Sequence, residues 1–174
     1  MPLTLDGNAG MTAPAGAVYN GLQLATAQTS TSGTSILFTG IPLWAKRVSI
    51  LFNGMSTSGT SLPLIQVGSG SIATTGYSGS AQNITTVPAS SNTAATTGWP
   101  LQGSSASNSY YGVLMLVNIT GNTWVISGTV NSSTAASGFV NGSVVLSGSL
   151  DRVNFTTTNG TDTFDAGTIN ILYE

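Results

Sequence analysis

The sequence of 174 residues contains no histidine and no cysteine. The missing thiols exclude disulfide bonds, thiolate zinc sites and cysteine nucleophiles. The missing imidazoles exclude a serine–histidine–acid triad and histidine-ligated metal centres. Lys46 is the only lysine that could serve a serine–lysine nucleophile, and its neighbour Arg47 at the start of a strand favours a solvated charged pair instead. We therefore expect no enzymatic activity, no cofactor and no metal site.

Charge is also scarce, with three basic and five acidic residues and none between Val48 and Leu150. Charged residues make up 5% of the chain, against about 25% in an ordinary globular domain. With so few cations and a net charge of −2, we expect no binding to nucleic acid, because such binding depends on neutralising phosphates. A neutral surface repels its own copies weakly, so many copies can pack together.

Long hydrophobic runs are missing as well. The longest apolar run extends from Val113 to Val117, whereas a membrane-spanning helix needs about 20 apolar residues. The first residues have neither a basic nor an apolar region of the kind found in signal peptides, so we expect synthesis in the cytoplasm and no membrane association. With 24 serines and 26 threonines, the surface must be hydrated mainly by hydroxyl and amide groups.

What the chain does contain is a regular series of β-type segments. Hydrophobic residues make up 40% of the sequence, and they occur in short runs separated by turn clusters such as Asn53-Gly54, without a helical period. About ten strands spaced every 8–12 residues predict an antiparallel β-sandwich over residues 20–174. These runs cover residues 22–28, 35–39, 48–52, 64–67, 72–77, 110–119, 124–130, 139–146, 153–157 and 168–173.

Several residues in and near these runs are expected to be buried. Residues 110–119 are nearly all apolar at their centre, which suits a strand that is buried on both faces. Trp124 shares a strand face with Ile126, so we expect it in the core, and we expect Trp44 to close one end of the sandwich.

Residues 1–19 differ from the remainder of the chain. They are rich in glycine, alanine and proline and lack the alternation of a strand, which predicts an extended arm. Such an arm is either a frayed terminus or an attachment segment that docks on a neighbouring subunit. In the second case its apolar side chains would make the contact: Leu3, Leu5, Met11, Val18 and Tyr19.

The stretch from Ser78 to Asn108 breaks the spacing of the strands. It is rich in serine, threonine, alanine and asparagine, with one weak strand expected near residues 84–87, and long loops in compact domains are often functional. We expect it to form an exposed loop. Trp99 in this loop, with Tyr110 and Tyr111 downstream, is the best candidate contact for a receptor or a glycan, because aromatic rings stack on sugar faces.

The remaining candidates are the charged residues. Asp162 and Asp165 lie three residues apart beside Asn159, an arrangement compatible with a calcium site, a catalytic acid pair, or simply a turn in which these side chains bind backbone amides. The turn is the favoured interpretation. Asp151 and Arg152 are either solvated or paired with Lys46 or Arg47, across the fold or across a subunit boundary.

Two segments resemble a known protein family. They are FTGIPLWAKR at residues 38–47 followed by FNGMST at 52–57, and LDRV at 150–153 followed by NGTDTFDAGTINILYE at 159–174. Both are similar to stretches of tailed-bacteriophage virion proteins, which are usually described as tail-fibre or uncharacterised phage proteins. The resemblance covers both ends of the domain and little of its middle. It implies a jelly-roll-like β-sandwich, a homotrimer, and display on the surface of a virion.

Composition and resemblance together predict a structural virion protein. A long tail fibre is disfavoured because the chain contains one domain and no heptad, collagen-like or shaft repeat. We therefore expect a capsid decoration protein, cement protein or head fibre whose partners are other copies of itself and the major capsid protein or another virion protein. The alternative is a tail-fibre domain that recognises a glycan on the host surface.

Overall fold

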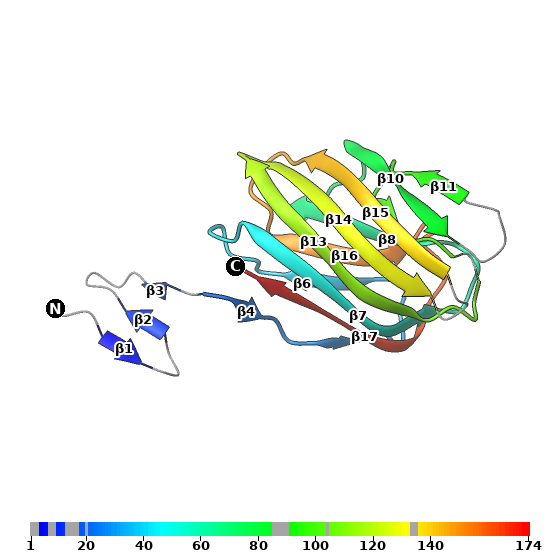
Figure 1. The fold of residues 1–174 in the computed structure, drawn as a ribbon, viewed down its shortest axis with the longest axis horizontal. Coiled ribbons are helices and arrows are strands. Elements are labelled where there is room, and N and C mark those ends of the chain that lie inside the picture. The colour runs from blue at the N-terminus through cyan, green and yellow to red at the C-terminus, as the bar shows by residue number, and fades with distance from the viewer. Residues whose placement is uncertain are drawn as a thin grey trace.

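The structure is a computed structural model that describes residues 4–6, 10–12, 18–19, 21–84, 91–103, 105–132 and 136–174. Its regular elements are all β-strands, and those of residues 21–174 form two facing antiparallel sheets (Figure 1). The antiparallel β-sandwich predicted from the sequence is therefore confirmed. The chain passes back and forth between the two sheets, as it does in a jelly roll.

The larger sheet contains nine strands in the order β11-β10-β15-β14-β13-β7-β17-β4, with β5 also paired to β17. Its longest strands lie at the centre, where β13 pairs with β7 on one side and with β14 on the other. The strands are β4 Gln23–Leu24, β5 Gln28–Thr29, β7 Arg47–Thr57, β10 Tyr77–Ile84, β11 Ser91–Ala94, β13 Tyr110–Thr120, β14 Thr123–Ser132, β15 Ala136–Val145 and β17 Phe164–Tyr173.

The smaller sheet contains five strands in the order β12-β8-β16-β6, with β9 paired to β8. Its strand β8 is buried along almost its whole length, because the other sheet covers one face and the segment that leads into β12 covers part of the other. The strands are β6 Ile36–Thr39, β8 Pro63–Ser69, β9 Ser71–Ile72, β12 Trp99–Pro100 and β16 Arg152–Thr157.

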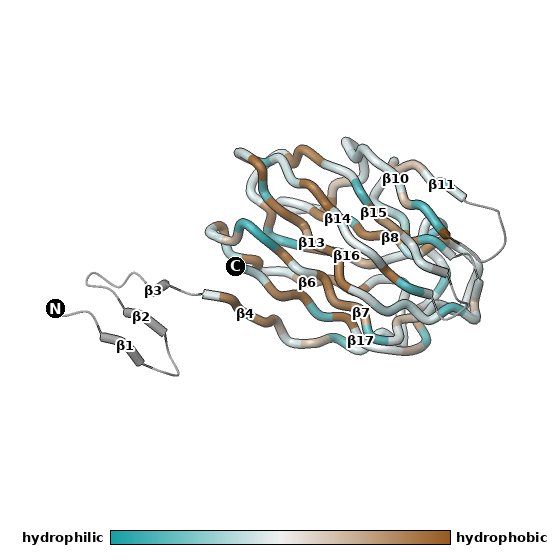
Figure 2. The backbone as a smooth tube through the Cα atoms, in the orientation of Figure 1, coloured by the Kyte–Doolittle hydropathy of each residue, from teal (hydrophilic) through white to brown (hydrophobic). Residues whose placement is uncertain are grey.

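The core lies between the two sheets, where apolar residues alternate with polar ones along most of the strands (Figure 2). Phe155 of β16 links the sheets, because its ring meets Phe52 of β7 edge-on at 5.7 Å and Phe38 of β6 edge-on at 6.0 Å. Aromatic pairs of this geometry add stability beyond the area that they bury. The largest fully buried side chains are Trp99, Tyr110, Phe155, Phe164, Ile50, Met55, Ile65, Leu101, Leu114 and Leu116.

Within the arm predicted over residues 1–19, the structure describes three short strands, β1 Thr4–Asp6, β2 Gly10–Thr12 and β3 Val18–Tyr19. They pair with one another as a small antiparallel sheet that lies beyond one end of the sandwich (Figure 1). Of the five predicted attachment residues, Leu3 lies outside the described residues. For Leu5, Met11, Val18 and Tyr19 only the backbone pairing is described.

Candidate interaction surface

The strand β13 carries apolar side chains on both of its faces. Its inward positions include Leu114 and Leu116, which are fully buried in the core. Its outward positions form a row that we name the β13 ridge: Tyr111, Val113, Met115, Val117 and Ile119. The sequence predicted burial of both faces, and this prediction is wrong for the outward face in the single chain, since Tyr111, Val113 and Met115 are 46–48% exposed.

The neighbours of the ridge are uncharged apart from Arg47, which lies opposite Val117 at one end. On β7, Val113 lies opposite Leu51 and Met115 lies opposite Ser49. On β14, the same two residues lie opposite Thr129 and Ser127. The exposed apolar row is therefore bordered on both sides by aliphatic, hydroxyl and amide groups.

A hollow lies beside the ridge, across β7 and β17. It has a volume of about 390 Å³. The outward side chains that line it are Leu51, Asn53, Val113, Thr168 and Asn170. The hydroxyl oxygen of Tyr111 lies over Gly54, 3.5 Å from the place that a Cβ atom would take there. The outward face thus has a ridge and an adjacent depression.

Two of the three predicted receptor contacts are buried, which corrects the prediction made for them. Trp99 is 0% exposed and belongs to β12, where it pairs with Ile65 of β8. Tyr110 is 2% exposed, and its hydroxyl group donates a hydrogen bond to the carbonyl of Gly103. Burial raises the pKa of the Tyr110 hydroxyl above its ordinary value, against the lowering effect of a hydrogen bond with Asn108. Only Tyr111 remains available to a ligand.

Trp99 is buried against Gly142, which has no side chain in the space that the indole ring occupies. Gly79 of β10 and Gly142 of β15 lie directly opposite each other in the large sheet. A Cβ atom on Gly142 would lie 2.5 Å from Trp99 Nε1, so the ring occupies the space that a side chain would need. The Nε1–H group donates to the carbonyl of Ser78 at 3.3 Å, and the ring meets Tyr77 edge-on at 4.8 Å.

The predicted exposed loop at 78–108 is therefore wrong for the part that the structure describes. That part consists mostly of β10, β11 and β12, and the weak strand predicted at 84–87 begins earlier, as β10 from Tyr77 to Ile84. Residues 85–87 of that prediction lie outside the described residues. The one sequence feature connected with the burial of Trp99 is Gly142.

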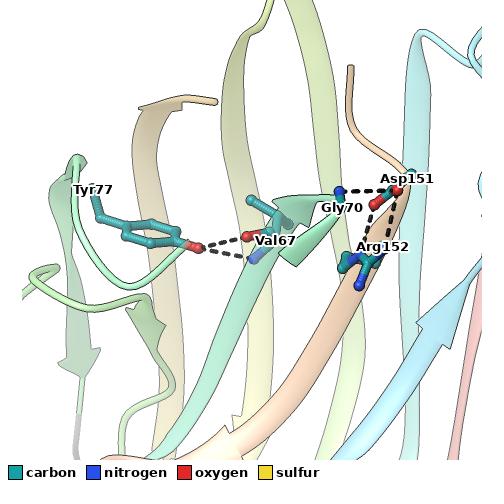
Figure 3. Close-up of polar contacts among 5 residues, drawn as sticks. All are labelled: Val67, Gly70, Tyr77, Asp151 and Arg152. Carbon is teal, nitrogen blue, oxygen red and sulfur yellow. Dashed lines mark hydrogen bonds and ion pairs between the residues drawn. The ribbon is translucent and has the colours of Figure 1, made fainter. Parts of the chain in front are cut away.

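Ion pairs form within the chain between Asp151 and Arg152 and between Arg47 and Glu174. Arg152 donates to Asp151 from Nε at 2.7 Å and from Nη2 at 3.1 Å, and Gly70 N–H also donates to Asp151 (Figure 3). The hydrogen bond from Arg152 is the main reason that the pKa of Asp151 lies below its ordinary value. Arg47 pairs with Glu174. Of the two alternatives considered for Asp151 and Arg152, pairing with Lys46 or Arg47 is thus not what the single chain shows.

Asp162 and Asp165 each bind a different segment. Asp162 accepts hydrogen bonds from Asn159 Nδ2 at 2.7 Å and from the backbone N–H of Ser61 at 2.9 Å, and the first of these is the main cause that lowers its pKa. Asp165 accepts from the hydroxyl of Ser56. Among the described residues no group of three or more acidic side chains is placed to hold a metal ion. Asn159 Oδ1 accepts hydrogen bonds from the backbone N–H groups of Thr161 and Asp162, which matches the turn interpretation.

A second group of exposed apolar side chains lies where the chain enters the sandwich from the arm. Leu24 of β4 is 63% exposed and lies opposite Leu172 of β17. The indole of Trp44 packs on the ring of Tyr173 at 5.9 Å and remains 40% exposed. Trp44 therefore does not close the end of the sandwich as predicted, whereas Trp124 is buried in the core as predicted. We name Leu22, Leu24, Trp44 and Tyr173 the arm-side cluster.

The two segments singled out in the sequence, 38–57 and 150–174, are neighbours in the fold. The first residues of the first segment, which end β6, pair with β16 at the start of the second, with Thr39 opposite Arg152. Ile41 N–H donates to the carbonyl of Asp151 at 3.1 Å, and Arg47 at the end of the first segment pairs with Glu174 at the end of the second. Segments more than a hundred positions apart in the sequence thus form one continuous block beside the arm-side cluster.

No protein-family model, no curated protein and no solved structure matches this chain. Across the part of the chain that the structure describes, no helix has the length and hydrophobicity required to cross a bilayer.

Proposed function

We propose that this chain is a non-enzymatic structural protein on the surface of a tailed-bacteriophage particle, in the role of a capsid decoration protein, cement protein or head fibre. The observation that carries the proposal is the continuous block formed by the two phage-like segments, which lies next to the arm and the arm-side cluster. The block resembles virion proteins, and its surroundings offer the apolar surface that an attachment site requires.

Attachment relies on apolar burial and backbone pairing rather than on ion pairs. In the sandwich all three cations lie at or next to the ends of strands, and Arg47 and Arg152 already have acidic partners within the chain. Leu22, Leu24 and Trp44 expose apolar surface beside the arm. In this proposal the arm and the arm-side cluster contact the major capsid protein or another virion protein, while the sandwich faces outward as a homotrimer.

The direct test is immunogold labelling of intact particles with antibodies against the sandwich. Label distributed over the head is the expected result. Label at the tail tip would favour the alternative, a receptor-binding domain, and particles that lack the protein altogether would overturn the proposal.

Reconstitution of purified protein onto particles that lack it tests the mode of attachment. Binding should be nearly the same at 0.05 M and 1 M salt, because few charges are available to be screened. Leu24→Ser combined with Trp44→Ser should reduce binding, whereas Val145→Ser, an equally exposed apolar residue on β15, should not. Loss of wild-type binding in high salt would contradict the proposed mode.

The alternative, recognition of a host glycan, now depends on one residue of the three predicted for it. Tyr111 is exposed beside Asn53, which lines the hollow. The loss of Trp99 and Tyr110 from the surface weakens this alternative.

A further inference from the structure

The outward face of β13 is unusual for a sheet that covers a core on its other side. Such sheets normally alternate apolar residues inward with polar residues outward. In β13 the five outward positions of the ridge are all apolar, from Tyr111 to Ile119. At about 3.3 Å per residue the ridge is roughly 27 Å long, which is the length of a substantial contact rather than of one stray exposed side chain.

The ridge and its margins have the composition of an interface. Protein interfaces combine an apolar centre with a polar rim that forms hydrogen bonds. Hydroxyl and amide side chains on β7 and β14, among them Ser49, Ser127 and Asn131, make up much of the rim here, and Leu51 and Val125 add aliphatic surface. Ser127 and Asn141 already bind each other at 2.8 Å, which shows that the rim residues are close enough to form hydrogen bonds along the face.

The charge pattern indicates what kind of partner covers the ridge. Among the described residues, the outward positions of β7, β13 and β14 carry one charged side chain, Arg47, which lies opposite Val117 at one end and is held by Glu174. Where copies of one chain meet around a rotation axis, side chains near the axis face their own counterparts. A charge there would meet a like charge, so a neutral ridge is complementary to itself. A foreign partner with ordinary surface charge would have to desolvate its ions without compensation.

We propose that the β13 ridge is the surface through which copies of this chain associate with one another. The ridge of one copy packs against the ridge and the adjacent hollow of the next. This inference names the face for the self-association in the proposed function, and it rests on that function only in expecting several copies to act together.

Sedimentation velocity and light scattering on the purified full chain test this inference. We expect wild type at 1–100 µM to have a mass of two or more times the 17.5 kDa of one chain. Val113→Ser combined with Met115→Ser should raise the concentration needed for association at least tenfold. The control Val145→Ser removes an apolar side chain that is 67% exposed on the same sheet, and it should associate like wild type. Circular dichroism and thermal unfolding of the monomer confirm that each variant is folded.

Because the chain has no cysteine, a single introduced thiol gives an independent measurement. Met115→Cys should form a disulfide between copies on mild oxidation, and Val145→Cys should not. A wild type that stays monomeric at 100 µM, or a ridge double variant that associates like wild type, would overturn the inference.

Other occupants of the ridge give distinct results. If neutral glycans on an array bind to a monomeric wild type and the variant Tyr111→Ala loses that binding, the ridge is a glycan site and the inference is wrong. If the protein associates as expected but immunogold finds it on no particle, the proposed function fails while the inference stands.

Discussion

Asn154 Nδ2 donates a hydrogen bond to Gln66 Oε1 at 3.1 Å, and both side chains are buried between neighbouring strands of the smaller sheet. Each of these two side-chain amides forms one further hydrogen bond. Ser35 Oγ donates to Asn154 Oδ1 at 2.6 Å, and Gln66 Nε2 donates to the carbonyl of Thr97 at 2.9 Å. These four residues tie the segment before β12 and the start of β6 to the centre of the sheet.

Asn154→Ala should therefore destabilise the fold. It leaves Gln66 Oε1 and the hydroxyl of Ser35 without their partner, and an unsatisfied buried polar group costs about 1–3 kcal/mol. The free energy of unfolding from urea titration is the measurement. Asn92→Ala on β11, where the side chain is exposed, is the matched control and should change stability by less than about 0.5 kcal/mol. Equal stability of the two variants would contradict the importance of this amide chain.

Tyr77→Phe should weaken the junction between β8 and β10. The Tyr77 hydroxyl accepts a hydrogen bond from Val67 N–H at 2.8 Å (Figure 3). It also lies 3.0 Å from the carbonyl of Ala73. Phenylalanine keeps the ring but leaves Val67 N–H unsatisfied in the core, at a cost of about 1–3 kcal/mol. Tyr111→Phe removes an exposed hydroxyl and should be nearly neutral.

The same tyrosine should make stability depend on pH in the alkaline range. Burial raises the pKa of Tyr77 to about 12 in the folded protein, whereas an unfolded tyrosine ionises near 10. The folded state therefore binds the proton more tightly, and this stabilisation is complete below pH 10 and is lost as the pH rises toward 12. Ultraviolet titration should show one tyrosine fewer ionising near pH 12 in Tyr77→Phe. An unchanged titration curve would disprove the assignment.

Gly142→Ala should displace Trp99. The new methyl group would lie 2.2 Å from the carbonyl of Ser78 and 2.5 Å from Trp99 Nε1, so either the β10–β15 pairing or the indole ring must move. Overpacking of this kind costs about 1–3 kcal/mol. We expect a lower melting temperature and a red-shifted tryptophan emission spectrum. Gly21→Ala, whose Cβ would meet nothing within 4 Å, should preserve both.

Asp151→Asn should reduce the loss of stability in acid. The pKa of Asp151 is lowered in the folded state, so its stabilisation is present above its ordinary pKa near 4 and is lost as the pH falls through the lower folded value. The carboxylate is partly exposed, which limits the effect to about 0.5 kcal/mol. Unfolding free energies at pH 5 and pH 2 should differ less in the variant than in wild type. The pKa of Asp162 is also lowered, so this residue makes stability depend on pH in both proteins.

The alternation of apolar and polar residues was sufficient to predict the sandwich and most of its strands. It predicted the centre of β7 but ended that strand at Asn53-Gly54, a pair typical of tight turns. The structure continues β7 to Thr57, with register shifts against β13 and β17. A positive φ at Gly54 is compatible with such an irregularity inside a strand as well as with a hairpin turn, so the local sequence does not distinguish the two.

The candidate site was harder to predict because it depends on contacts between distant segments. Trp99 follows a run of serine, threonine and alanine that is typical of a loop, and its burial requires Gly142, which lies more than forty positions later. The ridge follows from β13 alone, since its sequence is apolar on both faces. What the sequence does not contain is the identity of the strand face that remains uncovered, because that depends on the strand order of the whole sheet.

The edge strands β4 and β5 have a mechanical consequence. They are the first part of the sandwich that the chain enters after the arm, and they hold to β17 through short ladders and two further backbone hydrogen bonds, Ala25 N to Ile171 O and Ser30 N to Gly167 O. A pull on the arm loads these few bonds before any other part of the sandwich. The strands β4 and β5 would separate from β17 first, which would lengthen the connection between the arm and the sandwich. The remaining strands would then bear less of a sudden force.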